Sequence, residues 1–213
     1  MKTILFYGDS NTWGYVPGAG TRFPYERRWT SIVRKKLGPD YDVIVEALNG
    51  RTTVFDDPLR SARNGQFAFS VILESHAPIN LLVIMLGSND CKEHLHNRAV
   101  TIARGMRSLV ELARGKGFGP DGGDPKILIL SPPLITKGDQ RRANFDLREF
   151  TGAQAIAAEL SREYQKIAAE NACYFLDTAP IAKPSPIDGL HLTVESNAAL
   201  GEWIGGEIVK LEF

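Results

Sequence analysis

The chain has 213 residues, 43% of them hydrophobic, with 25 basic and 25 acidic side chains. This length and composition predict one α/β domain with a full core over residues 1–213. The balanced charge gives no basis for binding nucleic acid or an anionic membrane surface. No window approaches the 18 or so apolar residues that a membrane span needs, so we expect no membrane partner.

Two further features bear on the cellular compartment. The two cysteines, Cys91 and Cys173, are too few for a disulfide framework and suit a reducing compartment. The N-terminus has one lysine and a short apolar run that soon reaches Asp9, without the apolar region and cleavage site of a signal peptide. We therefore expect a cytoplasmic protein.

Apolar runs and helical periodicities alternate along the chain, in the order strand then helix. The predicted strands cover residues 4–8, 42–48, 80–86, 126–130 and 173–176. The predicted helices cover residues 26–37, 67–73, 98–116, 151–171 and 193 to the C-terminus. Such alternation predicts an α/β fold, a doubly wound parallel sheet in a three-layer α/β/α sandwich.

Glycine, proline and polar residues mark the connections between these elements. Residues 15–24 and 117–125 are predicted to be loops. Residues 136–150 are mostly polar but carry Phe145 and Phe150, and we expect a loop or short helix over the strand ends. The run over 80–86 is continuously apolar, as in a strand buried on both faces.

The residues that follow the first three strands have the chemistry that acyl transfer requires. Ser10 follows the first strand, where an open α/β sheet places its ligands. Gly50 follows the second, and without a side chain its backbone N–H can approach a substrate. Asn89 follows the third, and its amide donates two hydrogens. The simpler interpretation is a set of turns in which Asp9, Ser10 or Asp90 caps a helix.

The last predicted loop adds a carboxylate and an imidazole. Asp188 and His191 are three residues apart, so one short turn can hold the carboxylate against the ring and fix its tautomer, as a triad requires. A serine hydroxyl needs such a base, and a developing oxyanion needs preorganised donors.

Four stretches together resemble a known family. Gly8-Asp9-Ser10, Gly50, Gly87-Ser88-Asn89-Asp90 and Asp188-Gly189-Leu190-His191 are similar, in this order, to the four blocks of the SGNH (GDSL-type) hydrolases. The longer forms over 8–14, 51–53 and 84–90 resemble the arylesterase/perhydrolase branch. Asn11 departs from the pattern, because the GDSL label has leucine there.

The resemblance implies a fold and a set of residue roles. The fold is the SGNH hydrolase fold, with a five-stranded parallel sheet of flavodoxin-like topology. The implied catalytic residues are the nucleophile Ser10, the general base His191 and its orienting acid Asp188, with the Ser10 N–H, the Gly50 N–H and the Asn89 side chain as oxyanion hole. The implied substrate-pocket residues are Asn11, Trp13, Phe145, Phe150 and Leu190.

The function implied is a serine esterase that hydrolyses short-chain acyl or aryl esters through an acyl-enzyme. Acyl transfer to acceptors other than water, including perhydrolysis, is a related activity. The substrate is a small-molecule ester, and no cofactor is needed. A carbohydrate acetylesterase, a thioesterase and a lysophospholipase of the same family stay open as alternatives.

A different class of function is an alternative to the esterase. A non-catalytic, flavodoxin-like protein could bind phosphate with the loop over 8–14, but Asn89, Asp188 and His191 would then be unexplained. Neither Gly-x-Gly-x-x-Gly nor a Walker A pattern occurs. The absence of Gly-x-Ser-x-Gly argues against an α/β-hydrolase.

Two remaining stretches carry weaker expectations. Residues 91–96 contain a cysteine and two histidines, but no second ligand group stands at a known metal spacing, so we predict a solvated loop and no metal site. The segments over 15–28 and 136–150 could make the contacts of a homo-oligomer around the site.

Overall fold

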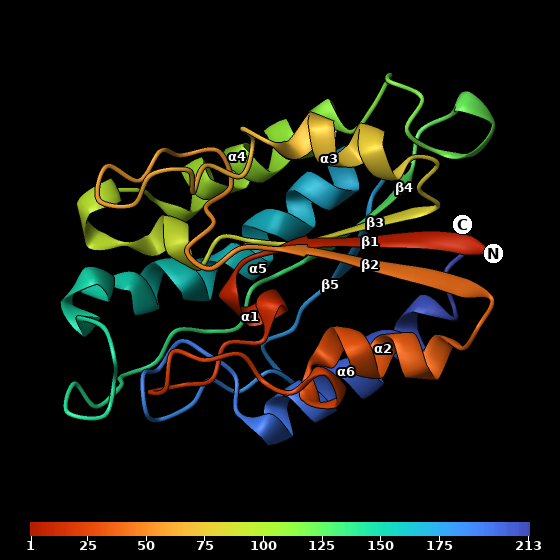
Figure 1. Cartoon of the computed structure of the whole chain (residues 1–213). Coiled ribbons are helices and arrows are strands. Elements are labelled where there is room, and N and C mark those ends of the chain that lie inside the picture. Colours follow the sequence, from red (N-terminus) through yellow and green to blue (C-terminus); the bar gives the residue numbers. More distant parts are fainter.

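The structure is a computed structural model that describes residues 1–213, arranged in three layers (Figure 1). The middle layer is a sheet of five strands, in the order β2-β1-β3-β4-β5, and every pair is parallel. The strands are β1 (Lys2–Gly8), β2 (Tyr41–Ala47), β3 (Leu81–Met85), β4 (Lys126–Leu130) and β5 (Tyr174–Leu176). This confirms the predicted fold.

Helices cover both faces of the sheet. One face packs against α3 (Phe69–His76), α4 (Ala99–Leu112) and α5 (Ala153–Glu170), and the other against α2 (Trp29–Leu37) and α6 (Val194–Ile208) (Figure 1). The short helix α1 (Ser10–Trp13) follows β1 directly. No helix combines the length and apolar character that crossing a bilayer demands.

Several predicted helices are shorter in the structure than in the sequence pattern. The helix expected over 26–37 begins at Trp29, because Arg28 is extended and residues 25–27 form a 3₁₀ turn. The helix expected over 98–116 ends at Leu112, and Gly115, at a φ of 66°, could not continue it. The last helix ends at Ile208 rather than at the C-terminus.

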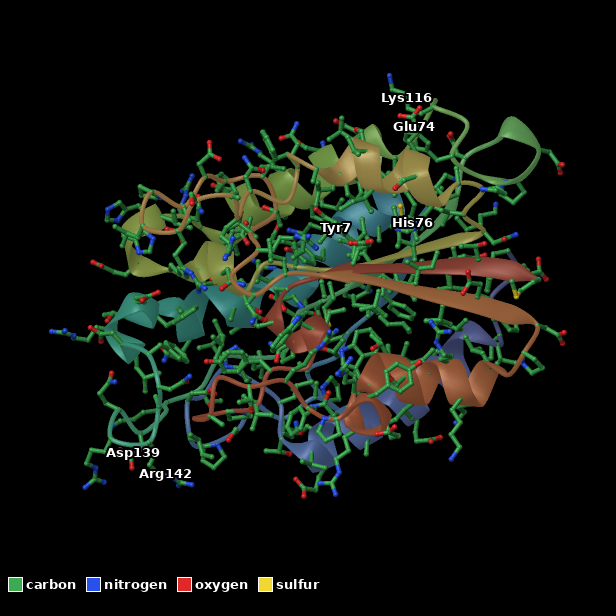
Figure 2. The ribbon with its side chains drawn as sticks, in the orientation of Figure 1. Tyr7, Glu74, His76, Lys116, Asp139 and Arg142 are labelled. Atoms are coloured by element: carbon green, nitrogen blue, oxygen red, sulfur yellow. The ribbon has the colours of Figure 1, made fainter.

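Alternating residues of each central strand enter two different cores. Ile4 and Phe6 pack on the side of α2 and α6, where the edge of Phe6 meets the Trp29 ring at 5.0 Å. Leu5 and Tyr7 pack on the side of α3, α4 and α5, and Figure 2 shows Tyr7 on that side. All five residues of β3 are buried, which confirms that this strand is covered on both faces.

The functional edge of the sheet is the one where the strands end. The order of the strands reverses between β1 and β3, which is where open α/β sheets form a crevice for ligands. Most of the long connections gather at this end of the molecule, whereas the one between α4 and β4 lies at the opposite end (Figure 1). Within the connection over 136–150, residues 147–150 form the 3₁₀ turn η5, and Asp139 and Arg142 mark its outer tip (Figure 2).

Candidate active site

Ser10 is placed at the cavity by a tight strand-to-helix turn. A Cβ at Gly8 would lie 2.5 Å from the Cβ of Thr12, so only glycine lets α1 fold back against the end of β1. Asp9 caps the helix, because its Oδ1 accepts the N–H of Asn11 at 2.9 Å. Ser10 is the first residue of α1, and it is 5% exposed.

Ser10, His191 and Asp188 form a continuous hydrogen-bonded chain. His191 Nε2 lies 2.9 Å from Ser10 Oγ, and Nδ1 lies 2.8 Å from Asp188 Oδ2. The other carboxylate oxygen of Asp188 accepts the backbone N–H groups of Leu190 and His191, both at 3.0 Å. Burial alone would raise the pKa of Asp188, but the hydrogen bond and charge of His191 and these N–H groups lower it. The acid therefore stays ionised beside the ring.

Three neighbours fix the position of the His191 ring and its loop. The Tyr15 ring stacks on the imidazole with centroids 4.0 Å apart, and Phe145 meets it edge-on at 5.9 Å. Asn11 Oδ1 accepts the N–H of Leu192 at 3.2 Å, and its Nδ2 donates to the Leu190 carbonyl at 3.3 Å. Asn11 thus ties the turn after β1 to the histidine loop. This corrects the expectation that Asn11 belongs to the substrate pocket.

Hydrogen-bond donors converge opposite Ser10 from two other strand ends. Gly50 has a φ of 84°, a conformation that favours glycine, and its N–H donates no hydrogen bond within the protein. Asn89 Nδ2 donates to the Arg51 carbonyl at 3.1 Å. Its second hydrogen bond, to Asp9 Oδ2, is long at 3.4 Å, so this is the donor hydrogen that a ligand oxygen can take over at the least cost.

A buried carboxyl holds these two strand ends together. Asp90 accepts the backbone N–H of Thr53 at 2.9 Å and the Thr53 hydroxyl at 2.5 Å. It does not cap a helix, because it lies inside the 3₁₀ turn over 89–91 and the N-cap of α4 is Arg98. Burial raises the pKa of Asp90 to about 6. Burial, with the nearby charge of Asp90, raises the pKa of Asp9 to about 7.

The chain of hydrogen bonds opens into a cavity of about 320 Å³. The predicted residues that line it are Ser10, Gly50, Asn89, Phe145, Phe150, Leu190 and His191. Trp13 is not among them, because its ring packs under the Arg22 guanidinium at 4.9 Å and beside Tyr15. The expectation that Trp13 forms a wall of the pocket is therefore corrected.

The cavity is also lined by six residues that were not predicted from the sequence. They are Tyr15, Asn49, Arg60, Lys92, Asn144 and Glu149. They lie in connections between the main elements, where no periodicity or motif marks them. Five of them are within five residues of Ser10, Gly50, Asn89, Phe145 or Phe150 in the sequence, whereas nothing pointed to Arg60.

The prediction of a solvated loop over 91–96 is wrong for its first two residues, although Glu93 and His96 are exposed. Cys91 is 1% and Lys92 2% exposed. Lys92 Nζ is 2.7 Å from Asp57 Oδ2, and His94 Nε2 is 3.0 Å from Oδ1 of the same carboxylate. Burial alone would raise the pKa of Asp57, but the hydrogen bonds from Lys92, His94 and a backbone N–H lower it to about 2. A lysine can be buried here because a distant loop supplies its counter-charge. No group of three or more histidine, cysteine, aspartate or glutamate side chains is placed to hold a metal.

A second cavity lies behind one wall of the first. It measures about 860 Å³ and lies largely under the segment over 136–150. The two cavities share four lining residues: Asn144, Phe145, Phe150 and Leu190. These four residues therefore form a partition between the space beside Ser10 and a larger space next to it.

Known proteins match both the sequence and the fold. A model of the GDSL-like lipase/acylhydrolase family matches residues 6–199. Among solved structures, the chain is similar to Est24, a carbohydrate acetylesterase from Sinorhizobium meliloti, with 34% identity, a TM-score of 0.92 and full coverage of both chains. The native aryl esterase of M. smegmatis matches with 33% identity, a TM-score of 0.92 and full coverage of both chains.

A carbohydrate acetylesterase family member from Sinorhizobium meliloti is 40% identical, with a TM-score of 0.91, over 99% of this chain and 98% of the other. A search of curated protein sequences finds no match. The family model covers most of the chain, and these neighbours cover nearly all of it. The chain therefore belongs to the GDSL-like lipase/acylhydrolase family, the SGNH hydrolases, and is a carboxylic ester hydrolase.

Proposed function

We propose that the protein is a serine esterase that cleaves small acetyl-type or aryl esters through an acyl-enzyme. The observation that carries this proposal is the hydrogen-bonded chain from Ser10 through His191 to Asp188, with distances of 2.9 and 2.8 Å. The chain ends in a cavity that Gly50 and Asn89 also line. A nucleophile, an oriented base and oxyanion donors are the parts that acyl transfer needs.

In the first half-reaction, Ser10 Oγ attacks the carbonyl carbon of the ester and its proton passes to His191 Nε2. The oxygen of the tetrahedral intermediate accepts hydrogen bonds from the N–H groups of Ser10 and Gly50 and from Asn89 Nδ2. Asp188, ionised, stabilises the imidazolium. The C–O bond to the alcohol then breaks, and the alcohol leaves with the proton from His191.

In the second half-reaction, water attacks the acyl-enzyme. His191 takes a proton from the water, and the second tetrahedral intermediate uses the same three donors. The bond to Ser10 breaks, Oγ regains its proton from His191, and the carboxylic acid is released. The chain supplies every group that these two steps use.

The size of the cavity supports a short acyl group. At about 320 Å³ it is at the small end of ligand pockets, and Phe145, Phe150 and Leu190 close one side of it. Aryl and sugar acetate esters are the substrates named for similar structures. Either fits a site whose acyl side is small.

Acyl transfer to an acceptor other than water is a second candidate activity. Aromatic rings contact two sides of His191, and Ser10 and His191 are 5% and 4% exposed. A bound alcohol or peroxide that displaces water from so enclosed a site would compete for the acyl-enzyme. Transesterification measured in aqueous buffer tests this activity.

Covalent labelling tests the proposed nucleophile. A fluorophosphonate should label the wild-type protein at Ser10, and Ser10→Ala should lose both labelling and ester hydrolysis while keeping its circular dichroism spectrum. Ser108→Ala, on α4 and away from the site, is the matched control and should keep both. Labelling of another serine in the Ser10→Ala variant would contradict the assignment.

A further inference from the structure

The lining of the active-site cavity includes a buried ammonium group that the proposed mechanism does not use. Lys92 lines the cavity, and its side chain is 2% exposed. Asp57, fully buried, accepts one hydrogen bond from Nζ at 2.7 Å. A lysine ammonium has three donors, so the contact with Asp57 fixes the group and leaves hydrogens for another partner.

A carboxylate from another element faces this ammonium. Glu149 belongs to η5, lines the same cavity and is 35% exposed. Its Oε2 lies 3.6 Å from Lys92 Nζ, too far for a direct hydrogen bond. The Glu149 carboxylate thus has Lys92 as its only charged partner, and it accepts no direct hydrogen bond from the protein.

We propose that Lys92 and Glu149 together bind a hydroxyl group of the substrate, so that the preferred ester carries a hydroxyl near the scissile bond. The inference rests on the proposed esterase function and adds the chemistry of its substrate. Two atoms 3.6 Å apart can both lie at ordinary hydrogen-bond distance from one oxygen. A hydroxyl both accepts, here from Lys92, and donates, here to Glu149.

The local charges favour a neutral hydroxyl over an ionic group. An anionic substituent would be attracted by Lys92 but would meet the carboxylates of Glu149 and Asp57. A cationic one would be attracted by Glu149 but would meet Lys92, and Arg60 also lines the cavity. His94 is bound to the far oxygen of Asp57. A hydroxyl satisfies both groups without adding charge to the site.

Isosteric esters test the proposal. 2-Hydroxyethyl acetate and propyl acetate differ by a hydroxyl in place of a methyl in the alcohol, and ethyl glycolate and ethyl propanoate differ in the same way in the acyl group. Each kcat/KM is divided by the rate of hydroxide-catalysed hydrolysis of that ester. In one pair the hydroxyl ester should be preferred by about tenfold or more, because a site built to hydrogen-bond a hydroxyl discriminates against the analogue that lacks it. The pair that responds identifies the part of the substrate that is bound.

Variants at position 149 tie that preference to the pair. The measure is the ratio of the normalised kcat/KM of the hydroxyl ester to that of its methyl analogue. Glu149→Ala should reduce this ratio about tenfold, towards one. Glu149→Gln, which keeps an acceptor oxygen, should give an intermediate ratio. Glu93→Ala removes an exposed carboxylate from the turn next to Lys92 and should leave the ratio unchanged. If Glu149→Ala does not fold, as judged by its melting temperature, the comparison of Glu149→Gln with Glu93→Gln replaces it.

Two results would overturn the inference: ratios near one in both pairs for the wild type, or a preference that Glu149→Ala and Glu149→Gln leave unaltered. In either case the esters are still hydrolysed. Failure of the proposed function is different, because no ester would be hydrolysed and no fluorophosphonate bound.

Discussion

Asn89 is fixed by its neighbours before any substrate binds. Its amide donates to the Arg51 carbonyl at 3.1 Å, and the carboxyl of the adjacent Asp90 binds Thr53. The donor that we assign to the oxyanion therefore needs no reorientation when charge develops. Such preorganised donors stabilise the transition state more than mobile ones, because they need little reorganisation during the reaction.

We expect Asn89→Ala to lower kcat by about 10²–10³ and to change KM little, because the lost hydrogen bond strengthens only as the oxyanion forms. Steady-state kinetics with an aryl acetate measure both constants. Asn89→Asp, which keeps the shape but replaces the donor with an acceptor, should lose at least as much. If KM alone rises, Asn89 binds the ground state of the substrate instead.

Single residues were predictable where chemistry and position in the chain coincide. Ser10, Gly50 and Asn89 stand at strand ends, and strand ends can be located from apolar runs. Asn11 and Lys92 could not be assigned, because their roles depend on partners far away in the sequence: Asn11 binds residues 190 and 192, and Lys92 binds Asp57. Nothing in a local pattern distinguishes a buried, paired lysine from an exposed one.

At the scale of elements, the segment over 136–150 controls the size of the site. It supplies Phe145 and Phe150, which separate the cavity of about 320 Å³ from the neighbouring one of about 860 Å³. Phe145 also contacts the His191 ring. One segment thus links the limit on the length of the acyl group to the position of the base.

The wild type should hydrolyse acetyl and propionyl esters with a higher kcat/KM than octanoyl esters, since each unaccommodated methylene costs about 1–3 kcal/mol. Phe145→Ala should open the partition and raise the octanoyl-to-acetyl ratio of kcat/KM by about tenfold or more. A series of p-nitrophenyl esters measures this ratio.

Phe67→Ala, at a ring that is 86% exposed, is the matched control for that series and should keep the wild-type ratio. A wild-type optimum at eight carbons or more would contradict the model and favour lipid substrates. An unchanged ratio in Phe145→Ala would mean that acyl chains do not reach the partition.

Elements were easier to predict from the sequence than the connections between them. The strand over 126–130 was predicted with its observed bounds, because a short apolar run between polar residues has few alternatives. The turn η5 was expected only as a loop or short helix, because its residues carry no periodicity. Its position is determined by tertiary contacts, among them the approach of Glu149 to Lys92 in the connection after β3.

For the whole molecule, the buried carboxyls at the site lower the free energy of unfolding by an amount that depends on pH. Asp9 is 1% exposed, and its folded-state pKa is about 7, against an ordinary value of 3.8. The folded-state pKa of Asp90 is raised as well, to about 6. Between about pH 4 and pH 7 the unfolded chain therefore binds fewer protons than the folded one. The free energy of unfolding must fall as the pH rises through this window.

Asp9→Asn should remove much of that fall, because the amide cannot ionise and asparagine is a good N-cap. A shift from 3.8 to about 7 corresponds to a difference on the order of 4 kcal/mol between pH 4 and pH 7.5. Urea unfolding of the wild type and the variant at both pH values measures this difference. Asp40→Asn, at an exposed aspartate, should keep the wild-type pH dependence. An equal fall in Asp9→Asn and in the wild type would show that Asp9 is not the group responsible.

The fold of the whole molecule could be predicted because alternating strands and helices leave few topologies. The match of the chain to SGNH hydrolase structures over its full length agrees with that prediction. A single domain, a cytoplasmic location and contacts between copies through 15–28 and 136–150 stay predictions. They depend on surfaces and surroundings that hydrophobic periodicity does not encode.

The distance along the chain between nucleophile and base has a consequence for biosynthesis. Ser10 and His191 are 181 residues apart in the sequence, and all five strands of the sheet precede the histidine. A nascent chain that has emerged as far as β5 already contains the serine and the oxyanion donors but no base. It is therefore inert towards esters while the ribosome is still adding residues. Esterase activity appears only when the last loop docks against the first turn, so its recovery during refolding reports the completion of the fold.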